Sequence, residues 1–299
     1  MLKIRKAGGV TLIELMIVLV IAAILVGGIY SLFMSQQRSY SVQDQVTGVQ
    51  QDARAALNIV ARDIRMAGYL LSGGGFNVNG AQFAVTPNNN AGGTDSITVA
   101  YAAETFISGV NPVTVTAVSG TQVTLSADAS SFFNPATVDR YVAFEGVDQV
   151  YQISAINTTT LTLTVAPPVF IASVGAKVYR AKSITYRVQN NALQRSENGA
   201  ISQPLAGDGI TTVVEDLQFA YQVAGSNDWI FDQVGDTWPA GTTNADIRMV
   251  RINVIVRTAV ADVQETGFFK PACEDHAQDN TDPGNRRRVY TTVVKVRNL

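Results

Sequence analysis

Apolar residues dominate one long stretch near the start of the chain. Residues 10–34 read VTLIELMIVLVIAAILVGGIYSLFM and carry a single charge, at Glu14. As a helix this stretch would be about 37 Å long at about 1.5 Å per residue. That length crosses a hydrocarbon layer of about 30 Å with some tilt. The pattern therefore predicts a membrane-spanning helix over residues 10–34.

The helical period continues beyond this stretch, but along one side only. Apolar residues recur at spacings of three or four, and polar residues such as Asp44, Arg62 and Asp63 lie between them. This stripe predicts an amphipathic continuation over residues 35–68, so that one helix runs from about residue 11 to 67 and ends at Gly68. A short coiled coil is the alternative. The stripe consists of Val42, Val46, Val49, Ala53, Leu57, Val60 and Ile64.

After residue 70 the hydrophobic period changes to two, with Gly, Asn and Pro between the runs. Such alternation predicts half-buried antiparallel strands that the long helix covers on one face. The predicted strands are residues 95–101, 113–118, 122–126, 141–144, 149–156, 160–165, 183–188, 213–222, 248–257 and 288–297.

Two stretches in this region resemble each other. Residues 115–126 and 153–164 share a strand–turn–strand pattern at an offset of 38 residues. Two copies do not make a solenoid, so we expect an inserted β-rich module over residues 104–178. The main β domain then consists of residues 69–103 and 179–299. The predicted fold is α+β, with a long N-terminal helix packed on an antiparallel sheet and an inserted β module.

Composition narrows the class of protein. The chain has 299 residues, of which 46% are hydrophobic and 15% charged, so it can bury a substantial core. Its net charge of −2 argues against a protein that neutralises nucleic-acid phosphates. The single cysteine, Cys273, rules out an internal disulfide, and the single histidine, His276, argues against a histidine-based triad.

No metal, cofactor or enzymatic activity is expected from the remaining motifs. Cys273 and His276 have C-x-x-H spacing, but a zinc site needs two further ligands of this kind and the chain has none. Two acidic segments could hold calcium through oxygen ligands, although neither follows the EF-hand pattern and solvated loops are favoured. Their residues are Glu274, Asp275, Asp279 and Asp282, and Asp228, Asp232 and Asp236 around Trp229.

A basic leader precedes the apolar stretch. Residues 1–9 contain Lys3, Arg5 and Lys6 and no acid. By the positive-inside rule this end stays in the cytoplasm and the C-terminal part is exported. A secretory signal peptide would have a shorter apolar core and a small-x-small cleavage site. A plain signal anchor explains the length and the charges, but not Glu14.

The carboxylate of Glu14 needs a partner. A charge at the centre of a spanning helix costs about 2.5–3.5 kcal/mol on insertion scales, and less near its end. Cleavage between Gly9 and Val10 would create an α-ammonium four residues before Glu14, which is within reach on one helix. Opposite charges about 4 Å apart attract by about 4 kcal/mol at an effective dielectric of 20. Between neighbouring subunits the same pair would set the axial register.

The segment GVTLIEL, from Gly9 to Leu15, resembles the type IV prepilin signature. The resemblance implies that a prepilin peptidase cuts after Gly9 and methylates Val10, and that Glu14 guides subunit docking during filament assembly. It also implies a pilin-like fold, in which the helix over residues 10–34 forms the filament core. The family usually has phenylalanine where this chain has Val10. Loss of the leader would leave 19 basic against 24 acidic residues, a net charge of −5.

Five further segments are similar to PilW-type minor pilins and to the J-type pseudopilin of type II secretion. They are residues 61–69, 184–188 with 193–195, 216–221, 250–257 and 288–298. The resemblance implies a low-abundance subunit in a tip or priming complex that promotes pilus assembly. Its partners would be other minor and major pilins, the prepilin peptidase, the inner-membrane assembly machinery and a tip adhesin.

The same resemblance implies a single-pass protein of the bacterial inner membrane, with its C-terminal domain in the periplasm and later in the pilus at the cell surface. Two alternatives stay open. One is a minor pseudopilin of a type II secretion or DNA-uptake system. The other is a membrane-anchored module that binds a surface and needs no leader cleavage.

Overall fold

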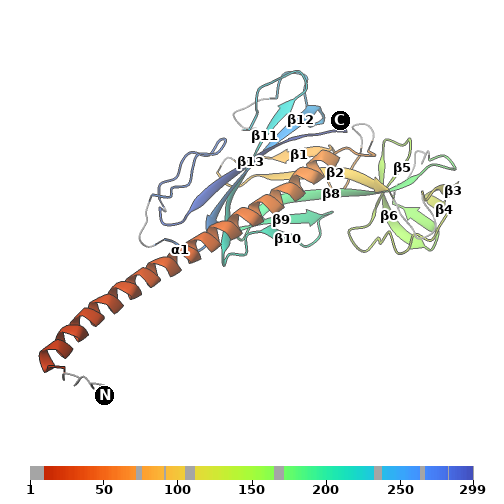
Figure 1. The fold of residues 1–299 in the computed structure, drawn as a ribbon. Coiled ribbons are helices and arrows are strands. Elements are labelled where there is room, and N and C mark those ends of the chain that lie inside the picture. Colours follow the sequence, from red (N-terminus) through yellow and green to blue (C-terminus); the bar gives the residue numbers. More distant parts are fainter. Residues whose placement is uncertain are drawn as a thin grey trace, which may run out of the picture. The chain divides into compact units, whose positions relative to one another are not determined.

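The computed structural model describes residues 10–71, 76–90, 92–104, 112–164, 172–231, 238–262, 267–281 and 283–298. Within them the chain forms one long helix and two antiparallel sheets (Figure 1). The chain divides between Thr47 and Gly48 into two compact units. We call them the N-terminal unit and the head unit, and describe each by itself.

Helix α1 (Leu12–Met66) is continuous over 55 residues, which confirms the predicted long helix to within one residue at each end. No proline interrupts this part of the sequence. Gly68 follows with a φ of 75°, the left-handed conformation that commonly caps a helix and that glycine adopts without strain. The Gly68 N–H donates to the Ala100 carbonyl at 2.9 Å, which ties the end of the helix to a strand.

The strands follow in chain order. They are β1 (Val85–Asn88), β2 (Ser96–Glu104), β3 (Val115–Ser119), β4 (Gln122–Leu125), β5 (Tyr141–Phe144), β6 (Val150–Asn157), β7 (Thr160–Leu163), β8 (Val178–Gln189), β9 (Ala192–Glu197), β10 (Gln203–Ala206), β11 (Thr212–Val223), β12 (Ile247–Thr258) and β13 (Arg287–Lys295). A short 3-10 helix, η1 (Asn244–Asp246), precedes β12. Every predicted strand is present, and β1, β9 and β10 are additional.

The larger sheet has ten strands, and β8 holds it together. Its main order is β1-β2-β8-β5-β6-β7-β4-β3, with β9 paired to β8 and β10 paired to β9. Strand β8 pairs with β2 over nine residues on one side. On its other side it pairs with β5 near its start and with β9 near its end. All of these pairs are antiparallel.

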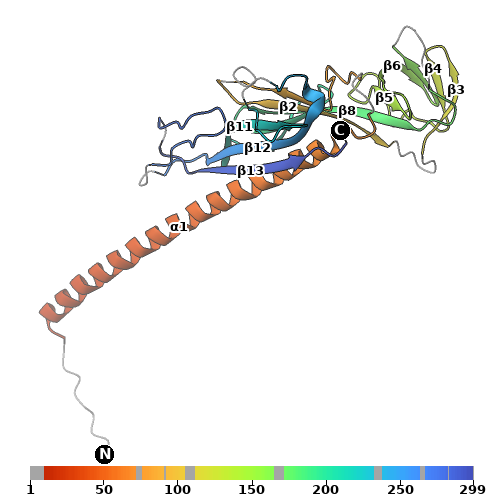
Figure 2. The ribbon, with the colours of Figure 1, turned by 90° about the horizontal axis from the view of Figure 1, so that it is seen from above.

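The smaller sheet has the order β11-β12-β13 and is also antiparallel (Figure 2). The free edge of β11 is tied to segments beside the larger sheet. Asp95 N–H donates to the Leu217 carbonyl at 2.8 Å, and Val214 N–H donates to the Asn191 carbonyl at 2.9 Å. The main β domain therefore has two sheets, where the sequence predicted one.

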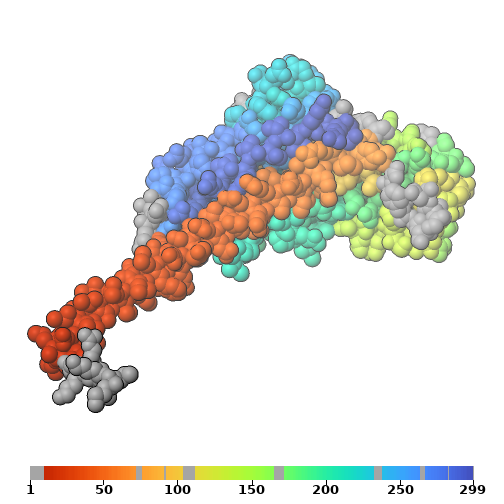
Figure 3. Space-filling view, viewed as in Figure 1, coloured from red at the N-terminus to blue at the C-terminus, as the bar shows by residue number. Residues whose placement is uncertain are grey.

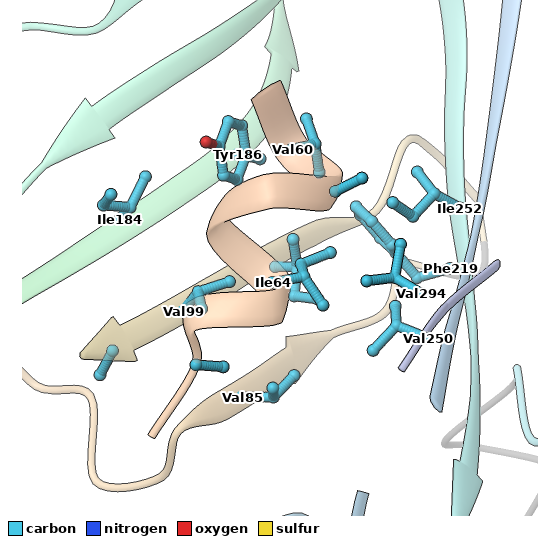
Figure 4. Close-up of a cluster of buried hydrophobic side chains, with 14 of the residues drawn as sticks. Val60, Ile64, Val85, Val99, Ile184, Tyr186, Phe219, Val250, Ile252 and Val294 are labelled. Carbon is cyan, nitrogen blue, oxygen red and sulfur yellow. The ribbon is translucent and has the colours of Figure 1, made fainter. Parts of the chain in front are cut away.

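The main core of the head unit lies between α1 and both sheets. In Figure 4, Ile64 of α1 has Val99 of β2 on one side, and Phe219, Val250 and Val294 of the smaller sheet on the other. All five side chains are almost completely buried. The helix is thus the layer on which the two sheets meet, as expected for an amphipathic stripe.

A second core fills the segment between β2 and β8. Its buried residues come from positions 113–178, with Phe133 and Leu161 among the largest. Strands β3 and β4 form one hairpin of this segment, and β6 and β7 form another.

The two hairpins repeat each other in register. Strand β3 has an irregularity between Val115 and Ala117, and β6 has one at the equivalent positions, between Ile153 and Ala155. Strands β4 and β7 then pair with each other so that Gln122 faces Thr162 and Thr124 faces Thr160, also at equivalent positions. The sequence repeat is therefore a structural repeat, in which two copies face each other about a pseudo-two-fold axis.

One prediction about the strands is wrong. Strand β11 was expected to bury a single face, yet ten of its twelve residues are buried. Its second face carries Asp216 and Gln218, which are buried under the segment that contains Lys270 and His276. Polar contacts cover this face, so hydrophobic alternation could not indicate it.

Candidate functional site

The N-terminal unit presents an uninterrupted apolar surface. An 18-residue window of α1 has a mean hydropathy of 2.9, and none of it is buried inside the structure. The large apolar side chains from Val10 to Met34 are all exposed, in most cases by more than half. Among the described residues, α1 is the one helix long and apolar enough to cross a membrane. A surface of this kind needs a lipid or protein environment.

Glu14 lies in the first turn of this helix and caps it. Its Oε2 accepts hydrogen bonds from the backbone N–H of Thr11 at 2.9 Å and from the Thr11 hydroxyl at 3.0 Å. The Glu14 N–H donates back to the Thr11 hydroxyl oxygen at 3.3 Å. This reciprocal arrangement is a capping box, in which both residues satisfy amide groups that the helix start leaves without partners.

Thr11 is a residue that the sequence reasoning passed over. The pattern T-x-x-E at positions 11–14 is the sequence signature of a capping box and could have identified it. The leader residues Lys3, Arg5, Lys6 and Gly9 lie outside the described residues. Cleavage after Gly9 and methylation of Val10 therefore stay predictions.

A buried network attaches α1 to the larger sheet. Asp63, which is 1% exposed, accepts hydrogen bonds at Oδ2 from the Tyr186 hydroxyl at 2.5 Å and from Arg195 Nε at 3.2 Å. Arg195 also contacts Glu197 at 3.4 Å, and Glu197 pairs with Lys182 at 2.9 Å. Two acids and two bases thus balance one another across α1, β8 and β9. Burial and the adjacent Asp63 raise the pKa of Tyr186, which keeps its hydroxyl a donor.

Asp63 corrects a second expectation. The sequence placed it among the polar residues outside the apolar stripe, whereas it is buried beside Val60 and Ile64 of that stripe. An ionised carboxylate tolerates burial only when charged and hydrogen-bonding partners surround it. Those partners come from residues more than 120 positions away, on β8 and β9.

The C-x-x-H pair lies in a tight turn. The backbones of Cys273 and His276 exchange two hydrogen bonds of 2.9 Å. His276 Nδ1 lies 2.7 Å from Asp216 Oδ2, and Lys270 Nζ contacts the same oxygen at 2.7 Å. Burial alone would raise the pKa of Asp216, but hydrogen bonds from Gln218, Lys270 and His276 hold it below its ordinary value. The turn therefore fastens the 267–281 segment onto β11.

The thiol of this turn, that of Cys273, is buried. Burial raises the pKa of the Cys273 thiol to about 12, so it stays protonated at neutral pH and is a poor metal ligand. Among the described residues, no three His, Cys, Asp or Glu side chains gather in a way that could hold a metal ion.

Of the acidic residues considered for calcium, Glu274 and Asp279 have other partners, whereas both buried carboxylate oxygens of Asp275 have no hydrogen-bond partner among the described residues. Both carboxylate oxygens of Glu274 accept hydrogen bonds from Arg251 at 2.7 Å, and Asn253 adds a third. Asp279 accepts from the Thr281 N–H at 2.9 Å. Asp232, Asp236 and Asp282 lie outside the described residues.

Asp95 is a buried acid between the two sheets. It accepts hydrogen bonds from the N–H groups of Asn90 at 2.9 Å and Phe219 at 3.0 Å. Burial nevertheless raises its pKa to about 6. Since the protonated form is favoured in the folded state, this group stabilises the fold below the ordinary aspartate pKa and loses that contribution as the pH rises through about 6.

Comparison with known proteins finds two family models that match this chain. Residues 174–298 match the family model described as Type IV Pilus-assembly protein W. Residues 4–30 match the model described as Prokaryotic N-terminal methylation motif. These matches confirm the resemblance to PilW-type pilins. The first covers β8 to β13, and the second contains Gly9, Val10 and Glu14.

Among solved structures, a type IV-like pilin from Thermus thermophilus is similar to this chain. The two share 12% sequence identity and superpose with a TM-score of 0.42, over 84% of this chain and 97% of that chain. No curated protein matches the sequence. By its two family matches, and with its long apolar helix before an antiparallel β domain, the chain is a type IV pilin-like protein with a PilW domain and an N-terminal methylation motif.

Proposed function

We propose that this protein is a minor subunit of a type IV pilus, inserted in the inner membrane and then assembled into the filament through α1. The observation that carries the proposal is the exposed apolar helix, with Glu14 at its start and the methylation motif around it. A helix that can cross a bilayer can also pack among like helices in a filament core. The role is structural and needs no catalytic site.

The size of the head unit supports a minor subunit. It holds two hydrophobic cores and a ten-stranded sheet that extends through the repeated hairpins. We propose that residues 104–178 are an inserted module on a smaller pilin domain, supported by the second core. Such a head suits a tip or priming complex with other minor pilins better than the regular body of a thin fibre. The head would then lie in the periplasm before assembly and at the cell surface afterwards.

Processing gives the first test. In cells with a prepilin peptidase, the mature chain is expected to begin at a methylated Val10, and in cells without the enzyme at Met1. Replacing Gly9 with valine should abolish cleavage because the peptidase recognises glycine before the cut, whereas the same change at the adjacent Gly8 should leave it intact. Mass spectrometry of the purified N-terminus measures both. A protein from peptidase-positive cells that still begins at Met1 would refute the proposed role.

Replacing Glu14 with alanine or glutamine gives the second test. The proposal expects membrane insertion to stay intact and incorporation into pili to fall about tenfold or more, since the carboxylate can no longer pair with an α-ammonium. Immunoblots of sheared pili and of membranes measure the two quantities.

The capping box supplies the control. Glutamine at position 14 can still accept the Thr11 hydrogen bonds, so it removes the charge and keeps the cap. Thr11→Ala does the reverse, at a cost of about 1 kcal/mol of helix stability. If Thr11→Ala impaired incorporation as strongly as Glu14→Gln, helix capping and not docking would explain the effect.

A further inference from the structure

Charges on α1 within the head unit divide between two faces. The two acids of this part of the helix turn towards the sheets: Asp52 lies 3.2 Å from the Thr212 hydroxyl, and Asp63 lies in the buried network. The three arginines, Arg54, Arg62 and Arg65, all turn outward. At 100° per residue their positions fall within an arc of about 80°, so they form one stripe.

Arg288 of β13 extends this stripe. Arg54 of α1 and Arg288 of β13 both lie close to Tyr290 of β13. Burial raises the pKa of Tyr290, and the positive charges of the two arginines oppose that rise. Helix and strand are therefore neighbours at this point. Further along, the Asn298 side chain donates to the Arg65 carbonyl at 3.3 Å. Figures 2 and 3 show α1 and β13 side by side between these points. We call the exposed residues Arg54, Arg62, Arg65 and Arg288 the basic stripe.

The basic stripe has almost no acids to balance it. In the part of the chain that the structure describes, the one ion pair that reaches it is a 3.6 Å contact from Arg62 Nε to Asp63 Oδ1, with the Arg62 side chain 72% exposed. Like charges on neighbouring surface positions slightly destabilise a fold. The whole chain moreover carries a net charge of −2. A purely basic surface on an acidic protein is therefore better explained by binding than by folding.

We infer that the basic stripe is the surface on which the acidic face of a neighbouring pilin subunit docks. This inference rests on the proposed function and adds to it the place and the chemistry of the contact. Because α1 is one continuous helix, the element that joins the filament core also carries three of the four arginines of the stripe. Complementary charge at such a contact fixes which subunits meet and in which register.

Other anionic partners fit less well. Arg54 follows Met34, the end of the apolar stretch, by 20 residues, which is about 30 Å of helix. Attraction to lipid headgroups falls off within a Debye length of about 8 Å. Nucleic-acid binding usually accompanies a basic domain, whereas the mature chain would be acidic. A protein partner is therefore the occupant that the charges favour.

Photo-crosslinking from the full chain in pili and membranes tests this inference. A photoreactive amino acid replaces Asn58, which is exposed on α1 between the arginines of the basic stripe. We expect an adduct with another pilin subunit. Its yield should fall about tenfold in the triple variant Arg54→Glu, Arg62→Glu, Arg65→Glu, because three charges at the rim of an interface contribute about that factor to affinity. The matched triple variant with lysine at the same positions should keep the wild-type yield. Raising the salt concentration should lower the wild-type yield as well.

A second photoreactive position, Ile24 in the apolar stretch, separates this inference from the proposed function. Adducts with pilins at position 24 but none at position 58 would overturn the docking surface and leave the filament role standing. Adducts at neither position would overturn both. Adducts of position 58 with phospholipid or DNA, or a glutamate variant that crosslinks like the wild type, would also overturn the inference. Equal denaturation midpoints for the glutamate and lysine variants show that folding is not the cause of a difference.

Discussion

Replacing Asp63 with alanine is expected to destabilise the head unit by about 3–5 kcal/mol. The change removes the acceptor of both Tyr186 and Arg195. The largely buried guanidinium of Arg195 then keeps only the longer contact of 3.4 Å to Glu197. Removing one partner of a buried pair costs more than the pair contributes, because the remaining charge stays desolvated. Chemical denaturation of the full chain in detergent, followed by near-ultraviolet circular dichroism of the head aromatics, measures the loss.

Asp44→Ala is the matched control for this change. It removes the same side chain from the same helix at an exposed position, so its effect should stay within about 0.5 kcal/mol. Tyr186→Phe keeps the ion pair and removes one hydroxyl, so it should cost about 1–2 kcal/mol. If Asp63→Ala proved no more costly than Asp44→Ala, the network would not be what attaches the helix to β8 and β9.

Much of the fold follows from the periodicity of the sequence. The long helix is predictable because no proline interrupts it and because its apolar residues recur at helical spacing up to Gly68. Strands such as β5 and β12 are predictable because their apolar residues lie in short β-rich runs between turn residues. The hairpin repeat is predictable from sequence because both copies keep the same alternation of residue types at a constant offset of 38 residues, with Ala117 and Ala155 at equivalent positions beside the bulge.

One missed strand did have a local signal. Asn190 and Asn191 both have positive φ angles, 54° and 61°, and form the two-residue turn between β8 and β9. A pair of asparagines between β-rich segments is typical of such a hairpin. The capping box of Thr11 and Glu14 had an equally readable pattern.

Other features had no local signal. Asp63 is a helix residue with ordinary polar neighbours in sequence, and its burial depends on Tyr186 and Arg195 from distant strands. The buried polar face of β11 likewise depends on Lys270 and His276, which arrive from a segment without regular structure. Contacts between residues far apart in sequence leave no periodicity, so the sequence alone could not reveal them.

The apolar layer between the two sheets gives the second large effect. Replacing Ile64 with alanine is expected to destabilise the head unit by about 2–5 kcal/mol. Ile64 is completely buried and packs between the larger sheet on one side and the smaller sheet on the other. Truncation leaves a cavity where these three layers meet, and close-packed layers relax only partly to fill it. The same denaturation experiment on the full chain measures the loss.

Two variants calibrate this result. Ile64→Val removes one methylene and should cost about 0.5–1.5 kcal/mol. Ile201→Ala makes the identical truncation at a residue that is 93% exposed, and its effect should stay within about 0.5 kcal/mol. A loss of unfolding free energy that increases from Ile201→Ala through Ile64→Val to Ile64→Ala would show that the contact between helix and sheets stabilises the head unit. An Ile64→Ala protein as stable as the Ile201→Ala protein would mean that the sheets hold together without the helix.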